Sequence, residues 1–296
     1  MEQEVTGTST DGGFGARLVQ AGRERGRLCV GIDPHPYLLE QWGLDDTPDG
    51  LRSFAMTCVE AFADEVAAVK PQVAFFERFG SRGFAVLEDT LAALQDANCL
   101  SIADAKRGDI GSTMAGYAAA WMRPESRLRA DAVTVSPYLG VGALQEVFNS
   151  SRETGCGVFV LAATSNPEAR QVQGATNPAG TTLAQAVVDE CASLNQDSLN
   201  TTSGSTVGNI GVVVGATVEN PPRLERLQGP VLLPGVGAQG AGVEDVEKIM
   251  GSAPELGFAN VSRGVLKTGP AVADLRDSAQ RIADSFSTPQ RTAGRD

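Results

Sequence analysis

Three charged side chains stand close together in a segment that begins where an apolar stretch ends. The segment reads Asp104-Ala105-Lys106-Arg107-Gly108-Asp109-Ile110. Because alternate side chains on a strand face the same way, Asp104 and Lys106 are expected to point together, and Gly108 lets the chain turn Asp109 towards them. Carboxylates beside an amine favour its protonated form, so the group predicts a site built around a positive charge. The alternative interpretation is a surface ion pair, which would contribute little.

A second group of residues, nearer the C-terminus, indicates a phosphate site. The glycine-rich segment 235–240 allows close approach of the backbone to a ligand, and Gln239 within it offers an amide. Arg263, which precedes Gly264, can bind two phosphate oxygens at once, although it could also form a surface ion pair. The segment 235–240 also matches the dinucleotide pattern G-x-G-x-x-G. That pattern belongs to the first strand–helix turn of a nucleotide-binding half, so a phosphate loop is favoured here.

The single histidine, His35, lies between Pro34 and Pro36. It could act as a general base, but its proline neighbours predict a rigid, extended turn, so a structural role is favoured. With one histidine in the chain, a histidine-rich zinc site is excluded, and no metal site is expected.

Short apolar runs recur along the chain, and each is followed by polar residues, Gly or Pro. This pattern is typical of parallel strands buried on both faces. The expected strands are 28–32, 66–69, 99–103, 132–135, 157–161, 210–214, 231–233 and 258–261. The expected helices are 54–67, 79–97, 113–121, 141–148, 182–194, 243–250 and 271–286. The alternation predicts an α/β protein with a single (β/α)8 TIM barrel, and a doubly wound sheet is the alternative.

In such a barrel the active site lies at the C-terminal ends of the strands. Polar residues follow almost every expected strand. Among them are Asp33, Lys70, Asp104, Lys106, Ser136, Thr164, Ser165, Pro234 and Arg263. Because these residues come from independent strands, their convergence on one rim is stronger support for a site than any single motif.

The composition bounds the size and the partners of the protein. The chain has 296 residues, 42% of them hydrophobic, and a formal net charge of −12. Nucleic acids and anionic membranes are bound through excess Lys and Arg, so neither is expected as a partner. We expect disordered tails at 1–13 and 287–296, a barrel domain at 14–286, and a polar loop inserted at 195–209.

The cysteines and the ends of the chain indicate a cytoplasmic protein. The five cysteines are odd in number and include no C-x-x-C pair. Cys29, Cys99 and Cys156 lie in or beside apolar runs, where a free cysteine behaves as a small hydrophobe. Disulfides are therefore not expected, and a reducing compartment fits best. The sequence shows neither a signal-peptide pattern nor an apolar run of the roughly 20 residues that span a bilayer.

The segment 104–110 resembles the D-x-K-x-x-D-I signature of the orotidine 5′-phosphate decarboxylase family. Further segments match that family in order: Ile32-Asp33, Lys70-Pro71-Gln72, Pro234 with Gln239-Gly240, and Ser262-Arg263-Gly264. The resemblance covers nearly the whole chain between the tails, and the chain length is similar to that of the longer bacterial subgroup. The D-x-K-x-x-D run also occurs in related sugar-phosphate decarboxylases, so Lys70, Gln239 and Arg263 carry the specific part of the resemblance.

The resemblance implies removal of CO2 from orotidine 5′-monophosphate (OMP) to give UMP, the last step of de novo pyrimidine nucleotide synthesis. It implies no metal and no organic cofactor. Lys106 would donate the proton to C6 of the pyrimidine, and Asp104 would face the substrate carboxylate. Lys70 would orient Asp104 and contact the ribose, and Asp33 would accept hydrogen bonds from ribose hydroxyls.

The resemblance also assigns residues at the edge of the site. Asp109, Ile110 and Thr113 would reach into the neighbouring subunit's site, which implies a homodimer with shared active sites. Ser165 would recognise the pyrimidine, and Thr164 beside it is a second candidate. The residues implied at the phosphate end are Pro234, Gln239, Arg263 and Gly264.

Three other functions stay open from the sequence. A magnesium-dependent sugar-phosphate decarboxylase or aldolase of the same barrel superfamily would use Asp33, Glu77 and Asp104 as oxygen ligands. A non-catalytic phosphate-binding barrel would have no need of Lys106. A dinucleotide-binding oxidoreductase would use the segment 235–240 and would bind NAD(P)H.

Overall fold

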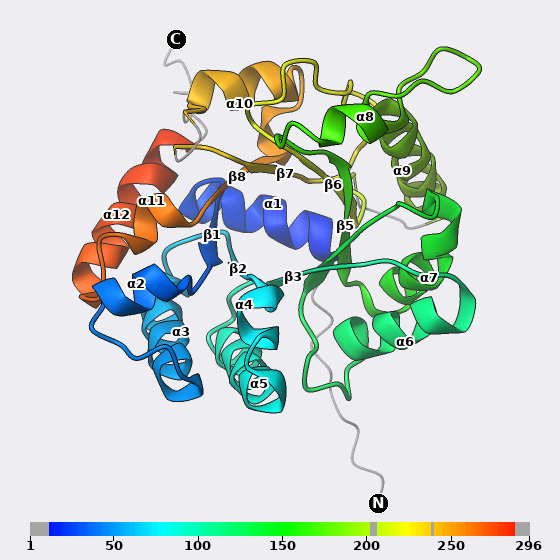
Figure 1. Cartoon of the computed structure of the whole chain (residues 1–296). Helices are drawn as coiled ribbons and strands as arrows, with labels where there is room; N and C mark the ends of the chain where they lie inside the picture. The colour runs from blue at the N-terminus through cyan, green and yellow to red at the C-terminus, as the bar shows by residue number, and fades with distance from the viewer. Residues whose placement is uncertain (1–11, 202–205, 238–239, 288–296) are drawn as a thin grey trace, which may run out of the picture.

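The computed structural model describes residues 12–201, 206–237 and 240–287. Eight strands in this part of the chain form one parallel sheet in the order β2-β1-β8-β7-β6-β5-β4-β3. The ends of the series, β2 and β3, meet through the bridges Val69↔Ser101 and Gln72↔Asp104. The sheet therefore closes on itself, and the helices surround it, which confirms the predicted (β/α)8 barrel (Figure 1).

The strands begin close to the predicted positions, but several of them run further at their C-terminal ends. Their bounds are β1 (Leu28–Ile32), β2 (Ala68–Pro71), β3 (Ile102–Arg107), β4 (Ala132–Val135), β5 (Gly157–Ala163), β6 (Ile210–Val214), β7 (Val231–Pro234) and β8 (Gly257–Val261). Strand β3 was expected to end at 103, yet it continues through the charged segment. Lys70, Asp104 and Lys106 thus lie within strands rather than in the loops that follow.

Helices cover the outside of the barrel in the predicted gaps. These are α3 (Pro48–Phe62), α5 (Gly80–Asp96), α6 (Gly111–Met122), α7 (Gln145–Thr154), α9 (Leu183–Thr201), α10 (Val243–Met250) and α12 (Val272–Ser285). The structure adds helices that the sequence patterns did not predict. They are α1 (Phe14–Arg25), α2 (Pro36–Gln41), α4 (Val73–Glu77), α8 (Ala169–Gln173), α11 (Arg263–Leu266) and the short 3-10 turn η2 (Pro254–Leu256). The helix predicted at 141–148 begins as a 3-10 turn, η1 (Val141–Leu144), which runs into α7. Within the described residues, no helix combines the length and apolar character needed to cross a membrane.

The polar insertion predicted as a loop at 195–209 is partly helical, because α9 continues through Thr201. Asn195 on this helix is fully buried. Its side-chain amide donates to the carbonyl oxygens of Ile210 at 2.7 Å and Leu227 at 2.8 Å, and its oxygen accepts from the backbone N–H of Ile210 at 3.1 Å. A buried asparagine that replaces sheet hydrogen bonds is invisible to an apolar pattern, so the helix end was missed.

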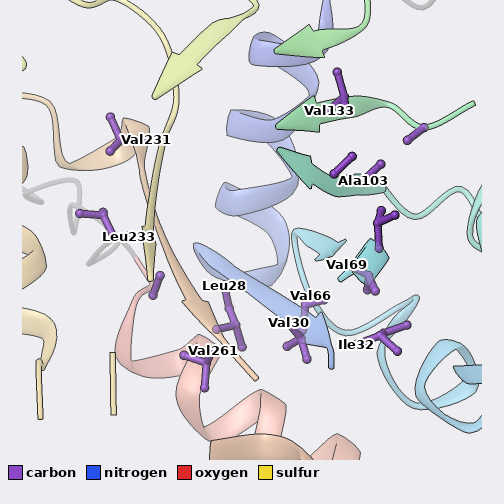
Figure 2. Packing of buried hydrophobic residues seen from close by; sticks show 14 of the residues in the cluster. Leu28, Val30, Ile32, Val66, Val69, Ala103, Val133, Val231, Leu233 and Val261 are labelled. Carbon is purple, nitrogen blue, oxygen red and sulfur yellow. The ribbon is translucent and has the colours of Figure 1, made fainter. Parts of the chain in front are cut away.

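Apolar side chains fill the space on both sides of the sheet. The larger cluster lies between the sheet and the outer helices, and Figure 2 shows some of its members, such as Val30, Val69 and Ala103. The smaller cluster lies inside the barrel and includes Phe14 of α1 and Phe159 of β5, whose rings meet edge to face at 5.8 Å. Helix α1 therefore plugs the barrel from one end, and the polar residues gather towards the other.

Candidate active site

The inward side of the barrel changes from apolar to polar towards the C-terminal ends of β2, β3 and β4. On each strand an inward apolar residue of the inner core is followed two positions later by a polar one, so Lys70, Asp104 and Thr134 share one layer. All three side chains are buried. Their position above the apolar plug gives the layer a low-dielectric floor, in which charges interact more strongly than in water.

Asp104 is the centre of this layer. Its Oδ2 accepts a hydrogen bond from Lys70 Nζ at 2.6 Å, and its Oδ1 accepts from Lys106 Nζ at 2.6 Å. The side chains of Lys70 and Asp104 are 6% and 9% exposed, whereas that of Lys106 is 44% exposed. The geometry thus fixes one buried ion pair and presents a second ammonium group to the open end of the barrel.

The charges of this pair follow from two opposing effects. Burial raises the pKa of Asp104, but the charges of Lys70 and Lys106 outweigh burial and hold that pKa well below its usual range. Burial lowers the pKa of Lys70, but the carboxylates of Asp104 and Asp33 outweigh it and raise that pKa above the ordinary value. Asp104 and Lys70 are therefore both charged at neutral pH.

Two residues to which the sequence patterns gave no role complete the environment of Asp104. Thr134 donates its hydroxyl to Asp104 Oδ1 at 2.9 Å and accepts the backbone N–H of Lys106 at 2.9 Å. Gln72, with its amide oriented to donate, reaches Asp104 Oδ2 at 2.6 Å and the Asp104 carbonyl oxygen at 3.2 Å. A single hydroxyl in the apolar run 132–135 was the available signal for Thr134.

Asp33 follows β1 and turns into the barrel. Its Oδ1 is buried and, among the described residues, receives no hydrogen bond. A Cβ at Gly31 would lie 2.8 Å from this oxygen and would overlap the Ser262 hydroxyl, so only glycine fits there. A buried carboxylate oxygen without a donor is costly, and a ligand hydroxyl would satisfy it.

The histidine beside Asp33 is held by aromatic rings. His35 stacks on Tyr37 with a centroid distance of 5.3 Å and meets Phe75 edge-on at 4.3 Å. Burial lowers the pKa of His35. The negative charge of Asp33 raises this pKa and the positive charge of Arg263 lowers it, and the net shift is downward. This packing agrees with the structural role that its proline neighbours predict.

The phosphate candidates lie at the ends of β7 and β8. Pro234 ends β7, and the backbone then adopts positive φ angles of 102° at Gly235 and 72° at Gly237, which favour glycine. Gln239 lies outside the described residues. Arg263 is exposed at the start of α11, directly before Gly264. The region therefore offers a guanidinium group and a glycine-rich backbone at neighbouring strand ends, which suits a doubly charged oxyanion.

The loop after β3 leads into α6 with several exposed side chains. Asp109 Oδ1 accepts the N–H of Ile110 at 2.8 Å, and Asp109 forms no ion pair within the described part of the chain. Ile110 is 61% exposed, and Thr113 is exposed in the first turn of α6. Gly108 has a second task besides turning, because a Cβ there would lie 2.5 Å from the Ser136 carbonyl oxygen.

The two candidates after β5 differ in their surroundings. Thr164 donates its hydroxyl to Asn166 Oδ1 at 2.7 Å and its N–H to Gln173 Oε1 at 2.8 Å. Ser165 is exposed and lies beside Gly215 at the end of β6. The long segment that follows β5 is thus ordered by its own side chains and by α8.

The oxygen ligands that a magnesium site would need do not gather. Glu77 pairs with Arg107 at 2.9 Å, and both oxygens of Asp104 face ammonium groups. No three His, Cys, Asp or Glu side chains form a metal-binding group among the residues that the structure describes. All five cysteines are buried and free, including Cys29, Cys99 and Cys156, which the sequence places in or beside apolar runs.

Comparison with known proteins gives one consistent result. The sequence model of the orotidine 5′-phosphate decarboxylase / HUMPS family matches residues 26–278. The orotidine 5′-phosphate decarboxylase of Corynebacterium glutamicum is 56% identical over 273 residues, which are 92% of this chain and 97% of that protein. The enzyme of Salinispora arenicola with the same name is 55% identical over 270 residues, which are 91% of this chain and 95% of that protein. A Streptomyces avermitilis crystal structure assigned to the same enzyme superposes with a TM-score of 0.88 at 49% identity, over 93% of this chain and 95% of that one.

Proposed function

Because this chain belongs to the orotidine 5′-phosphate decarboxylase / HUMPS family, we propose that Lys106 is the proton donor in the decarboxylation of OMP to UMP that the chain catalyses. The activity rests on the relatives of that name, which are similar over more than nine-tenths of the chain. One observation carries the role of Lys106: its half-exposed ammonium group is held at 2.6 Å from a buried, ionised carboxylate. The magnesium and dinucleotide alternatives lack such an observation.

The reaction breaks the bond between C6 of the pyrimidine and its carboxylate. CO2 leaves, the electron pair stays on C6, and Lys106 Nζ gives its proton to that carbon, after which water can restore the proton on the amine. Asp104 is ionised before substrate binds, because Lys70 stabilises its charge, so the ammonium group is oriented in advance. Preorganised charges of this kind need no rearrangement when negative charge develops, and they can supply much of a large rate enhancement.

The substrate lies across the rim in this proposal. Asp33 accepts hydrogen bonds from the ribose hydroxyls, which would satisfy its buried Oδ1, and Lys70 contacts the ribose beside it. Arg263 and the backbone N–H of Gly264 hold the phosphate, and Pro234 borders it. Binding energy from these distant groups can then be used to stabilise the transition state at C6.

We also propose recognition of the base by residues after β5. Ser165 is our candidate for the pyrimidine edge, in line with the family resemblance, and Thr164 beside it is the second candidate. Gln239 would join Arg263 at the phosphate, in line with the family signature.

The active form in this proposal is a cytoplasmic homodimer. Asp109 and Ile110 stand on the loop after β3, Thr113 follows in the first turn of α6, and Tyr138 and Leu139 stand on the loop after β4. The three apolar members are 61%, 81% and 56% exposed at Ile110, Tyr138 and Leu139. A second copy would cover these side chains and bring Asp109 to the partner's site.

The activity is tested by an assay with OMP after the protein has been treated with a chelator. We expect loss of the OMP absorbance and formation of UMP at the rate of the untreated protein. Turnover that disappears with the chelator and returns with Mg²⁺ would contradict the proposal and favour the metal-dependent relatives.

A further inference from the structure

Arg107 lies on the opposite face of β3 from Lys106. The outward positions Ala103 and Ala105 belong to the core between the sheet and the helices, and Arg107 is the next outward residue. Its side chain is 22% exposed. Asp104 and Lys106 point into the barrel, so Arg107 cannot act on the substrate directly.

The guanidinium group of Arg107 is held from three directions. Nη2 forms an ion pair with Glu77 Oε1 of α4 at 2.9 Å, and Nη1 donates to the Ala105 carbonyl oxygen at 3.1 Å. The group also lies over two rings of α6, with centroid distances of 5.7 Å to Tyr117 and 5.9 Å to Trp121. The Arg107 side chain has four rotatable bonds, and its contacts with a carboxylate, a carbonyl oxygen and two rings hold it in one position.

The backbone that Arg107 anchors has an unusual conformation. The register of β3 with β4 shifts between Ala103 and Arg107, and Lys106 between them has a φ of 47°. Residues other than glycine rarely adopt this region, and they keep it only where the surroundings hold it. Thr134 binds the N–H of Lys106 on one side, and the Ser136 N–H donates to the Arg107 carbonyl oxygen at 2.8 Å on the other.

We propose that Arg107 is a positioning residue for Lys106. The clamp, formed by Glu77, Tyr117 and Trp121, fixes Arg107 on the helix side of β3. Arg107 in turn keeps Lys106 in the left-handed conformation, which directs the Lys106 ammonium group to Asp104. The inference rests on the proposed role of Lys106 as proton donor. It also explains Glu77, whose carboxylate serves the clamp rather than a metal.

The test separates positioning from binding. For Arg107→Ala we expect kcat for OMP to fall by about 30- to 100-fold, the size of effect known for a misplacement of about 1 Å. KM and the affinity for the product UMP should change less than about threefold, because the phosphate and ribose groups come from other strands. Added guanidinium ion should restore part of kcat, and Arg107→Lys should restore less than the wild-type value, because lysine lacks the planar fork.

Two further variants complete the experiment. Arg127→Ala removes an exposed arginine that pairs with Glu88 at 2.7 Å, and its kcat should equal that of the wild type. Glu77→Gln should lower kcat less than Arg107→Ala does, and the double variant should be no slower than Arg107→Ala alone, because both changes break one clamp.

The inference is overturned if Arg107→Ala keeps kcat within twofold, or if kcat and UMP affinity fall together with the folded fraction. A wild-type protein without OMP turnover would contradict the proposed function instead, so the two failures are distinguishable.

Discussion

At the scale of single residues, the site depends on a carboxylate that is shared by two ammonium groups. Asp104 and Lys70 are buried together at 2.6 Å, and each makes burial of the other's charge tolerable. Removal of Asp104 would leave Lys70 as a buried charge without its ion-pair partner, which costs about 3–5 kcal/mol in comparable pairs. The exposed Lys106 adds little to stability by comparison, because solvent screens it. In the proposed mechanism, the buried pair of Lys70 and Asp104 supplies fixed charges, and Lys106 transfers the proton.

Thr134 gives the first prediction at this scale. Thr134→Val keeps the shape of the side chain but removes the hydrogen bonds to Asp104 and to the Lys106 N–H. We expect kcat to fall about tenfold, since a hydrogen bond to a charged group contributes about 1.5–3 kcal/mol. Steady-state kinetics with OMP measures the effect.

The matched control is Thr90→Val, another buried threonine, whose hydroxyl donates to the Val86 carbonyl oxygen within α5. Its kcat should equal that of the wild type. Equal kcat values for the two valine variants would show that the hydroxyl of Thr134 does not organise the site.

At the scale of elements, the apolar pattern of the sequence predicts the buried part of each strand. It misses the polar residues by which strands such as β3 extend towards the site. Strands β1, β4 and β6 coincide with the expected ranges, whereas β3 runs four residues further, from 103 to Arg107. The apolar pattern identifies residues whose side chains are buried against the helices or the inner core. Residues at the rim belong to the strands through their backbone hydrogen bonds, but their side chains are polar, so the pattern does not include them. Strand ends at an active site are therefore where such a pattern fails.

The elements that were missed have physical reasons too. Helices α2, α4, α8 and α11 have six residues or fewer, which is too short for a helical period to show. Helix α1 is long enough, but no helix was predicted for 14–25, which was only placed inside the barrel domain. The site residues Lys70, Asp104 and Lys106 were predicted from their types and order, whereas Thr134 and the clamp of Arg107 need three-dimensional contacts that no local pattern contains.

The plug formed by α1 leads to a prediction about stability. A Cβ at Gly157, the first residue of β5, would overlap the ring of Phe14, which is fully buried. Gly157→Ala should therefore lower the free energy of unfolding by about 1–3 kcal/mol through overpacking. Urea-induced unfolding followed by circular dichroism measures it.

Gly142→Ala is the control, because a Cβ there would meet no heavy atom within 4 Å. Its stability should stay within about 0.5 kcal/mol of the wild type, as for most surface substitutions. An unchanged stability of Gly157→Ala would mean that α1 is not packed against β5 as described.

At the scale of the whole molecule, an acidic protein must bind an anionic substrate. The net charge of −12 repels OMP at long range. The positive groups that we assign to the substrate, Lys70, Lys106 and Arg263, come from three different strand ends. Closure of the barrel brings these ends to one rim, so the fold supplies a local cationic site that the overall charge does not.

The proposed shared sites predict complementation between inactive subunits. Lys106→Ala and Asp109→Ala should each be inactive alone, but equal co-expression should place half of the chains in mixed dimers with one intact site of two. One quarter of all sites would then be intact, so the activity of the mixture should approach about one quarter of that of the same amount of wild-type protein.

Co-expression of Lys106→Ala with a Lys106→Ala, Asp109→Ala double variant is the control, because no pairing of these chains restores a site. Activity in the mixture no higher than in this control would argue against sites shared between subunits.

The most direct test of the account is the turnover of OMP by Lys106→Ala. The variant should fold with an unchanged unfolding midpoint and bind UMP normally, because Lys106 is half exposed and Asp104 keeps its buried partner Lys70. Its kcat should fall by about 10³-fold or more, as expected when a proton donor and a preorganised charge are lost together. Turnover near the wild-type rate in the folded variant would contradict the role of Lys106 as the proton donor.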